Sequence, residues 1–238
     1  MPPTIVLVHG AFAESASWDG VIDPLVAEGH RVVAAANPLR GLASDAQSIS
    51  DLVRTIEGPV VLVAHSYGGA VISNVDADAG DIAGLVYVNG FAPEPGENCF
   101  GLAGMFPGSM LGEATVRPVP RRDGTTDLYI APDSFHDVFC QDVPAPQAAL
   151  MAATQRPATQ EALVEPSGER PLWKHVPSWF LIGEEDRIIP AALQHYMAKR
   201  ANARRTIEVP GASHAATVAH PDATAHLILE AAALHVAA

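Results

Sequence analysis

Cysteine is scarce in this sequence: its 238 residues include only Cys99 and Cys140. Their separation does not match the ligand spacing of a metal site, and two cysteines in a chain of this size are weak evidence for a disulfide. Reduced, buried thiols are the simpler interpretation. The cysteine content therefore favours a cytoplasmic location and gives no reason to expect a metal.

Positive charge is also scarce. Lys and Arg together number 14 against 27 Asp and Glu residues, which gives a formal net charge of −13. Binding to a phosphate backbone requires clustered cations, whereas this chain has only two short basic pairs, at residues 121–122 and 204–205. The charge balance argues against nucleic acid as a partner and disfavours anionic substrates.

Long hydrophobic runs are missing as well, although 48% of the residues are hydrophobic. No run approaches the length of a membrane span, so we expect no membrane association. Residues 1–4 lack a basic region followed by an apolar core, so we expect no secretory signal. The length fits one α/β domain with a modest insertion.

Short apolar runs alternate with amphipathic segments both before residue 93 and after residue 171. The runs predict strands of a mainly parallel sheet, at residues 4–8, 31–35, 60–64, 84–88, 178–182 and 206–209. The segments between them predict helices on both faces of the sheet, at about residues 18–26, 44–56, 67–80, 190–200 and 221–235. Ser44 and Gln47 fit a capping box at the start of the second helix.

The segment of residues 93–171 breaks this alternation. It is rich in Pro and Gly and carries scattered Phe and Met residues, so it is too long for an ordinary connection and too apolar for a disordered linker. An irregular surface excursion is the alternative to a folded insertion. We expect a small helical cap, inserted into an α/β core of residues 1–92 and 172–238, with helices near residues 134–141, 147–154 and 159–164.

A serine follows the apolar run at residues 60–64. The sequence Ala64-His65-Ser66-Tyr67-Gly68-Gly69 predicts a sharp turn from strand to helix, which strains the residue at its apex. Small residues two positions before and after Ser66 fit such a turn, although Ala64 stands where glycine is usual. The turn predicts a nucleophilic hydroxyl at the carboxyl end of the sheet.

Polar residues follow the predicted strands at the edge where reactive groups gather in α/β sheets: His9, Ser66, Asn89, Asp186 and His214. An activated serine requires a base and a carboxylate that orients the base. Ser66, Asp186 and His214 fill these roles in the chain order serine, aspartate, histidine. Glu184 and Glu185 are neighbouring alternatives to Asp186.

Two backbone amides are expected to bind the oxyanion that forms during attack. One is the amide of Tyr67, directly after the nucleophile, and the other belongs to Ala11 or Phe12 in the loop after the first strand. We expect His9 to brace this loop rather than to react, and His65 to lie behind the turn.

Two further polar clusters do not fit a metal site. The acidic residues within 76–81 occupy too short a segment for a full cation loop. The residues His214, His220 and His226 recur every six positions, which does not place them on one helical face. We therefore predict neither a metal nor a cofactor.

Four motifs together resemble the α/β-hydrolase superfamily: Val8-His9-Gly10-Ala11-Phe12, the serine motif at residues 64–69, Gly183-Glu184-Glu185-Asp186-Arg187-Ile188-Ile189-Pro190, and Gly211-Ala212-Ser213-His214. The resemblance covers about residues 4–92 and 172–236 and implies an α/β-hydrolase fold. Within the superfamily, the chain is similar to the small esterase group of plant methylesterases, hydroxynitrile lyases and bacterial EstC-like esterases. Members of this group either hydrolyse esters or cleave cyanohydrins.

Two positions separate these activities within the resemblance. The plant lyases that resemble this chain carry Thr at the position of Gly10 and Lys at the position of Ala215. Without the Lys cation, departing cyanide has no stabilising partner. The resemblance therefore favours hydrolysis.

These observations predict a serine carboxylesterase that cleaves small uncharged esters or lactones through an acyl-enzyme on Ser66. We expect an apolar substrate pocket, formed by Phe12, Tyr67, Phe91, Met105, Phe106 and Phe135. The protein is expected to act as a monomer or homodimer on a small-molecule ester. The alternatives are another reaction of the same triad (perhydrolase, haloperoxidase-like or hydroxynitrile-lyase-like), or a receptor-like ligand-binding protein.

Overall fold

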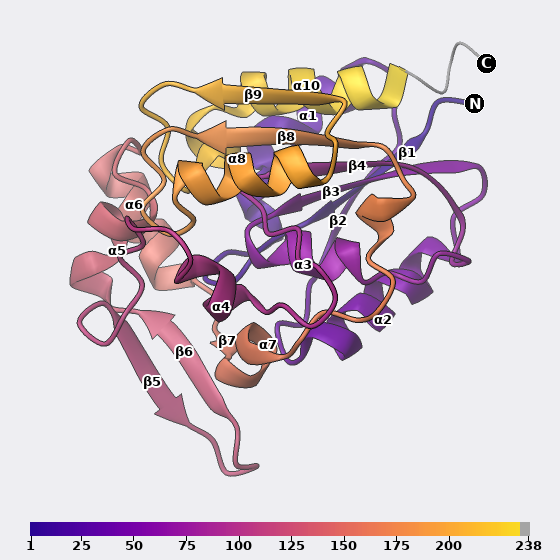
Figure 1. Ribbon diagram of the computed structural model, residues 1–238. Coiled ribbons are helices and arrows are strands. Elements are labelled where there is room, and N and C mark those ends of the chain that lie inside the picture. Colours follow the sequence, from indigo (N-terminus) through magenta and orange to yellow (C-terminus); the bar gives the residue numbers. More distant parts are fainter. Residues whose placement is uncertain (234–238) are drawn as a thin grey trace.

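The computed structural model describes residues 1–233 and contains two β-sheets (Figure 1). The larger sheet has six strands, all parallel, in the order β2-β1-β3-β4-β8-β9. Its strands are β1 (Thr4–Val8), β2 (Val32–Ala35), β3 (Pro59–His65), β4 (Asp81–Val88), β8 (Ser178–Gly183) and β9 (Arg205–Val209). The six-stranded parallel sheet expected from the apolar runs is confirmed.

Helices cover both faces of this sheet (Figure 1). They are α1 (Asp19–Ala27), α2 (Leu42–Val53), α3 (Tyr67–Ser73), α8 (Ala191–Arg200) and α10 (Pro221–Ala233). Strand β3 is apolar on both sides because it is buried on both sides. On one face of the sheet, Leu62 packs with residues of α2, α3 and α8. On the other face, Val61 packs with residues of α1 and α10. Within residues 1–233, no helix combines the length and the apolar character needed to cross a membrane.

Helix α2 differs from its prediction at its start. The capping box at Ser44 is wrong, because Gly41 is the N-cap and the Ser44 hydroxyl donates to the Gly41 carbonyl at 3.0 Å. The Asp45 carboxylate accepts the amide of Arg40 instead, with both oxygens at 3.1 Å. Helix α3 is also shorter than predicted and ends at Ser73.

Three short helices of the α/β core were not predicted: η1 (Ser15–Trp18), η2 (Leu172–Lys174) and α9 (Ala216–Ala219). Each lies in a connection of the α/β core, where a single turn leaves no periodic pattern in the sequence. The predicted end of the last helix, His235, lies outside the described residues.

The segment 93–171 is folded. Its elements are α4 (Cys99–Ala103), β5 (Val116–Pro120), β6 (Thr126–Ile130), α5 (Pro132–Phe139), α6 (Ala145–Thr154), β7 (Ala158–Thr159) and α7 (Gln160–Val164). Helices α5, α6 and α7 match the three expected helices, whereas helix α4 and the antiparallel sheet β5-β6-β7 were not predicted. Pro118 and Pro120 argued against a strand at this position, because proline interrupts the hydrogen bonds of a central strand. They are tolerated in β5 because it is an edge strand.

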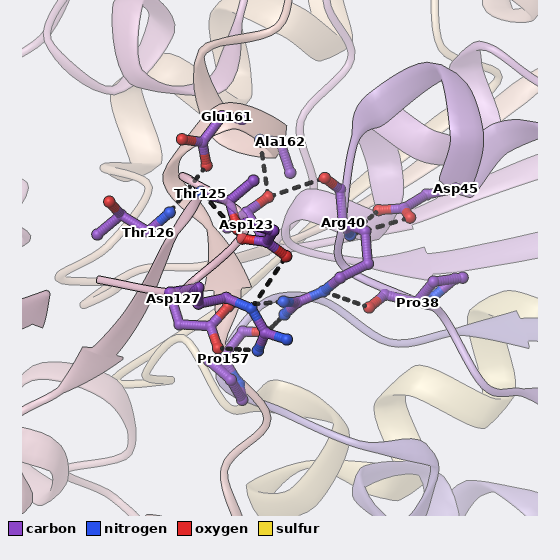
Figure 2. A network of polar contacts seen from close by, with 12 residues as sticks. Pro38, Arg40, Asp45, Asp123, Thr125, Thr126, Asp127, Pro157, Glu161 and Ala162 are labelled. Carbon is purple, nitrogen blue, oxygen red and sulfur yellow. Dashed lines mark hydrogen bonds and ion pairs between the residues drawn. The ribbon is translucent and has the colours of Figure 1, made fainter. Parts of the chain in front are cut away.

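An ion-pair network joins the small sheet to the core (Figure 2). Asp127 on β6 accepts hydrogen bonds from Arg40 at 2.6 Å and from Arg121 at 2.9 Å, and Arg40 also donates to the Pro157 carbonyl at 2.6 Å. Burial opposes ionisation of Asp127, but the bonds from Arg121 and Arg40 hold the pKa of its carboxyl below the usual value. The inserted segment is therefore tied to the loop that precedes α2.

The fully buried His9 links the ends of β1 and β2. Its Nδ1–H donates to the Gly10 carbonyl at 2.9 Å, and its Nε2 accepts the amide of Asn37 at 3.1 Å. The Asn37 side chain donates in return to the His9 carbonyl at 2.9 Å. One ring nitrogen is a donor and the other an acceptor, so these contacts require the neutral ring. Burial lowers the pKa of His9 to about 4.

We expect acid to destabilise the protein through His9. Between about pH 6.5 and about pH 4 the unfolded chain binds a proton at this ring and the folded chain does not, so the free energy of unfolding falls as the pH falls. The full contribution, about 3 kcal/mol, is present above pH 6.5. Urea unfolding of the wild type and of His9→Gln at several pH values measures it: the variant should depend less steeply on pH, and equal slopes would contradict the assignment.

Close backbone contact at α3 predicts a second stability effect. A Cβ atom at Gly69 would lie 2.4 Å from the carbonyl oxygen and 2.8 Å from the nitrogen of Phe91, so the backbone has to move. We expect Gly69→Ala to lower the free energy of unfolding by about 2–4 kcal/mol. The control is Gly112→Ala, where a Cβ meets no atom within 4 Å. Urea midpoints that are the same for the two variants would refute the expectation.

Candidate active site

Ser66 lies at the turn between β3 and α3 in a conformation that side chains rarely adopt, with φ 56° and ψ −127°. The backbone around this turn is packed so closely that two neighbouring positions have room only for glycine. A Cβ atom at Gly10 would lie 2.5 Å from the Ser66 Cβ, and one at Gly68 would lie 2.6 Å from the Val8 carbonyl oxygen. The strain at Ser66 is therefore maintained by packing against the end of β1.

His214 and Asp186 meet in the interior at the carboxyl ends of β9 and β8. The His214 Nδ1 lies 2.8 Å from the Asp186 Oδ2, and neither side chain is exposed. The His214 Nε2 is buried and has no hydrogen-bond partner among residues 1–233. The rival carboxylate of Glu184 instead accepts the amide of Gly211 at 2.8 Å. The carboxylate beside His214 is thus that of Asp186.

The Asp186 carboxylate is surrounded by neutral donors. Its Oδ1 accepts the amides of Ile188 at 2.8 Å and Ile189 at 2.9 Å. Its Oδ2 accepts, besides His214, the side-chain amides of Asn89 at 2.8 Å and Gln194 at 2.9 Å. Asn89 was expected at this edge because it follows β4, whereas Gln194 was missed. The only available signal was a polar residue on the core-facing side of α8.

The His214 ring is enclosed by two other rings. His65 donates from Nε2 to the His214 carbonyl at 2.7 Å, with ring centroids 4.6 Å apart. Phe139 of α5 meets the His214 ring edge-on at 5.0 Å. Burial, followed by the nearby His214, lowers the pKa of His65 well below its usual value, so this ring stays neutral. The contribution of Phe139, which comes from the inserted segment, was not predicted.

The three expected oxyanion amides differ in their contacts. The amide of Phe12 donates to the Arg156 carbonyl at 2.9 Å, and Phe12 has a positive φ of 62°. The amides of Ala11 and Tyr67 donate no hydrogen bond to any other described residue. The Tyr67 hydroxyl donates to Asp45 at 2.8 Å.

A cavity of about 320 Å³ adjoins Ser66. Four expected pocket residues line it: Phe12, Tyr67, Phe91 and Phe106. The other lining residues are Ala11, Ser66, Cys99, Phe100, Ala103, Gly104, Pro107, Gly108, Ser109, Leu111, Leu163 and Ile188. No Asp, Glu, Lys, Arg or His residue lines it. Burial raises the pKa of the Cys99 thiol, so that group is uncharged too.

Two expected pocket residues do not line this cavity. Met105 is 50% exposed on the outside of the segment after α4. Phe135 is fully buried, and its ring stacks on Phe139 at 5.0 Å. Both assignments were wrong because composition predicts that an inserted segment has an apolar interior, but not which side chains face the cavity beside Ser66.

The described residues contain no group of three or more His, Cys, Asp or Glu side chains placed to hold a metal ion. His220 lies 3.2 Å from Asp142 instead. In the acidic segment 76–81, Asp76 pairs with Arg54 at 2.6 Å.

Two relatives are similar to this chain in sequence. A pyrethroid hydrolase from Sphingobium wenxiniae is 28% identical over 244 residues, which cover 95% of this chain and 86% of that protein. A carbendazim hydrolyzing esterase from a Nocardioides species is 34% identical over 110 residues, which cover 41% of this chain and 46% of that protein. Both relatives are named for hydrolysis, which supports a hydrolase.

The fold is shared with solved structures. The crystal structure of the methylesterase MES16 from Arabidopsis superposes with a TM-score of 0.78 at 16% identity, covering 98% of this chain and 99% of that one. A family model described as the alpha/beta hydrolase family matches residues 5–227. This match spans the turn at Ser66 as well as Asp186 and His214. The expected fold is confirmed, and the chain belongs to the alpha/beta hydrolase family.

Proposed function

We propose that this protein is a serine carboxylic ester hydrolase that cleaves small uncharged esters or lactones. The observation that carries the proposal is the buried Asp186–His214 pair, whose free Nε2 belongs to the same sheet edge as the strained Ser66. The hydrolase names of the two relatives support the reaction class. The uncharged cavity beside Ser66 supports the substrate class.

The mechanism assigns one proton path to the pair. The Nε2 of His214 accepts the proton of the Ser66 hydroxyl, while Asp186 holds Nδ1–H and stabilises the charged ring. The Ser66 oxygen attacks the ester carbonyl, and His214 returns the proton to the departing alcohol. Water then attacks the acyl carbon with His214 again as base, the bond to the Ser66 oxygen breaks, and His214 returns the proton to that oxygen as the carboxylic acid leaves. Catalytic hydrogen bonds often close only in the substrate complex, so the unpartnered Nε2 fits this path.

We assign the oxyanion hole to the amides of Ala11 and Tyr67. Each is free to donate among the described residues, whereas the amide of Phe12 is used by the Arg156 carbonyl. Donors of this type are typically worth about 3–4 kcal/mol of the reaction barrier. The contact to Arg156 therefore supports Ala11 over Phe12 as the second donor.

Other reactions of the same site find less support. The lyase route requires a cation near the base, and no Lys or Arg lines the cavity. A receptor-like role would leave the unpartnered Nε2 of His214 without a use. Perhydrolysis needs the same triad and differs in the molecule that attacks the acyl-enzyme.

Replacing the nucleophile tests the proposal. We expect Ser66→Ala to lower the rate of 4-nitrophenyl butyrate hydrolysis by at least about 10³-fold, and to abolish labelling by a fluorophosphonate. The control is Ser44→Ala, which removes an exposed hydroxyl on α2 and should change neither reading. Turnover that survives in Ser66→Ala would end the proposal.

The cavity also predicts selectivity against charge. We expect kcat/KM for 4-nitrophenyl butyrate to exceed that for the 4-nitrophenyl monoester of succinate by at least about 10-fold, because a buried carboxylate without a cation is costly. The two esters share a leaving group and differ mainly in the terminal carboxylate. Equal rates for both would show that the acyl group does not enter this cavity.

A further inference from the structure

We propose that Asn89 and Gln194 are positioning residues that hold Asp186 as an anion aimed at His214 without the help of any cation. The proposal rests on the proposed serine hydrolase function and extends it to two side chains that touch neither the substrate nor the nucleophile.

The contacts of Asp186 Oδ2 carry the proposal. This single oxygen accepts three hydrogen bonds: from Asn89 at 2.8 Å, from Gln194 at 2.9 Å and from His214 at 2.8 Å. All four side chains are buried. The ring of His214 therefore shares its acceptor with two carboxamides.

Both carboxamides point their nitrogen toward Asp186 and leave their oxygen without a partner. The Asn89 Oδ1 and the Gln194 Oε1 are buried and have no hydrogen-bond partner within residues 1–233. A buried polar atom without a partner is unfavourable, so some other contact has to compensate. Each amide nitrogen donates to Asp186 and to one backbone carbonyl, so a rotated amide would place its oxygen against both the carboxylate and that carbonyl.

No cation offers a competing explanation. Among the described residues, no Lys or Arg forms an ion pair with Asp186. Arg187, the next residue, is bound to the carbonyl and the carboxylate of Asp137. Hydrogen bonds to the charged form are then the remaining means of keeping a buried carboxylate ionised, and Oδ1 obtains only the two backbone amides.

The same carboxamides also connect the three segments that form the site. Asn89 follows β4, has a positive φ of 45°, and donates to the Ser213 carbonyl at 2.9 Å as well as to Asp186. Gln194 on α8 donates also to the Ile189 carbonyl at 2.6 Å. Asp186 is therefore fixed relative to the His214 loop by one residue and relative to α8 by the other.

This arrangement has an electrostatic consequence for the reaction. Before His214 accepts a proton, the Asp186–His214 pair carries one negative charge, and the two N–H dipoles stabilise that charge. Removal of a dipole lets the pair bind a proton more readily, so the acid limb of the kcat/KM profile moves to higher pH. Two other titratable groups contact the His214 loop from other elements: His65, which is neutral, and Asp142, which accepts the Ser213 amide at 2.9 Å and contacts His220.

The experiment compares pH profiles for 4-nitrophenyl butyrate in the wild type and in Gln194→Met, which keeps the length of the side chain and removes the donor. We expect kcat to fall about 10- to 100-fold, KM to change less than about 3-fold, and the acid limb to move up by about 0.5–1 pH unit. The matched control is Gln141→Met. Gln141 also donates from a carboxamide to this loop, to the Glu185 carbonyl at 2.8 Å, but not to Asp186, so its profile should not move.

A second variant keeps the test decisive if Gln194→Met does not fold. Asn89→Asp preserves the shape, tolerates the positive φ and replaces the donor by an acceptor, so the shift of the acid limb should be larger. Lowered stability or kcat with an unmoved acid limb in the folded variants would overturn the proposal. The hydrolase function itself fails only if the wild type does not turn over the ester or Ser66→Ala still does.

Discussion

Close approach of backbone segments around Ser66 is the constraint on which the rest of the site depends. Ser66 has a left-handed conformation, and a Cβ atom at Gly10, Gly68 or Gly69 would collide with a neighbouring main chain or with Ser66 itself. These contacts join the turn to the end of β1 and to the loop after β4. The orientation of the hydroxyl is therefore a property of the whole sheet edge, because the turn alone could relax.

The sequence predicted the parallel sheet and the residues at its carboxyl edge, because continuous apolar runs mark strands buried on both faces. Ser66, Asp186 and His214 were placed at strand ends for this reason, and the structure brings Asp186 and His214 into contact. The choice of Asp186 over its acidic neighbours needed coordinates. It depends on which carboxylate faces the interior.

The inserted segment could not be predicted to the same depth. The prolines in the edge strand β5 concealed its antiparallel sheet. Its apolar composition also did not show that Met105 is exposed and that Phe135 is buried away from the cavity. Yet this segment contributes to the site, since Phe139 packs on His214 and the Arg156 carbonyl occupies the amide of Phe12. Contacts between segments far apart in the chain leave no local pattern in the sequence, and the same holds for Gln194.

The position of His214 has a consequence for assembly. Its loop follows β9, the last strand within residues 1–233 and an edge strand of the sheet, whereas Ser66 directly follows the central strand β3. Parallel sheets are built from contacts between distant segments and form slowly. Under the proposed mechanism, a chain in which the Ser66 turn has formed but the loop after β9 has not yet docked would lack the His214 base and could not turn over an ester.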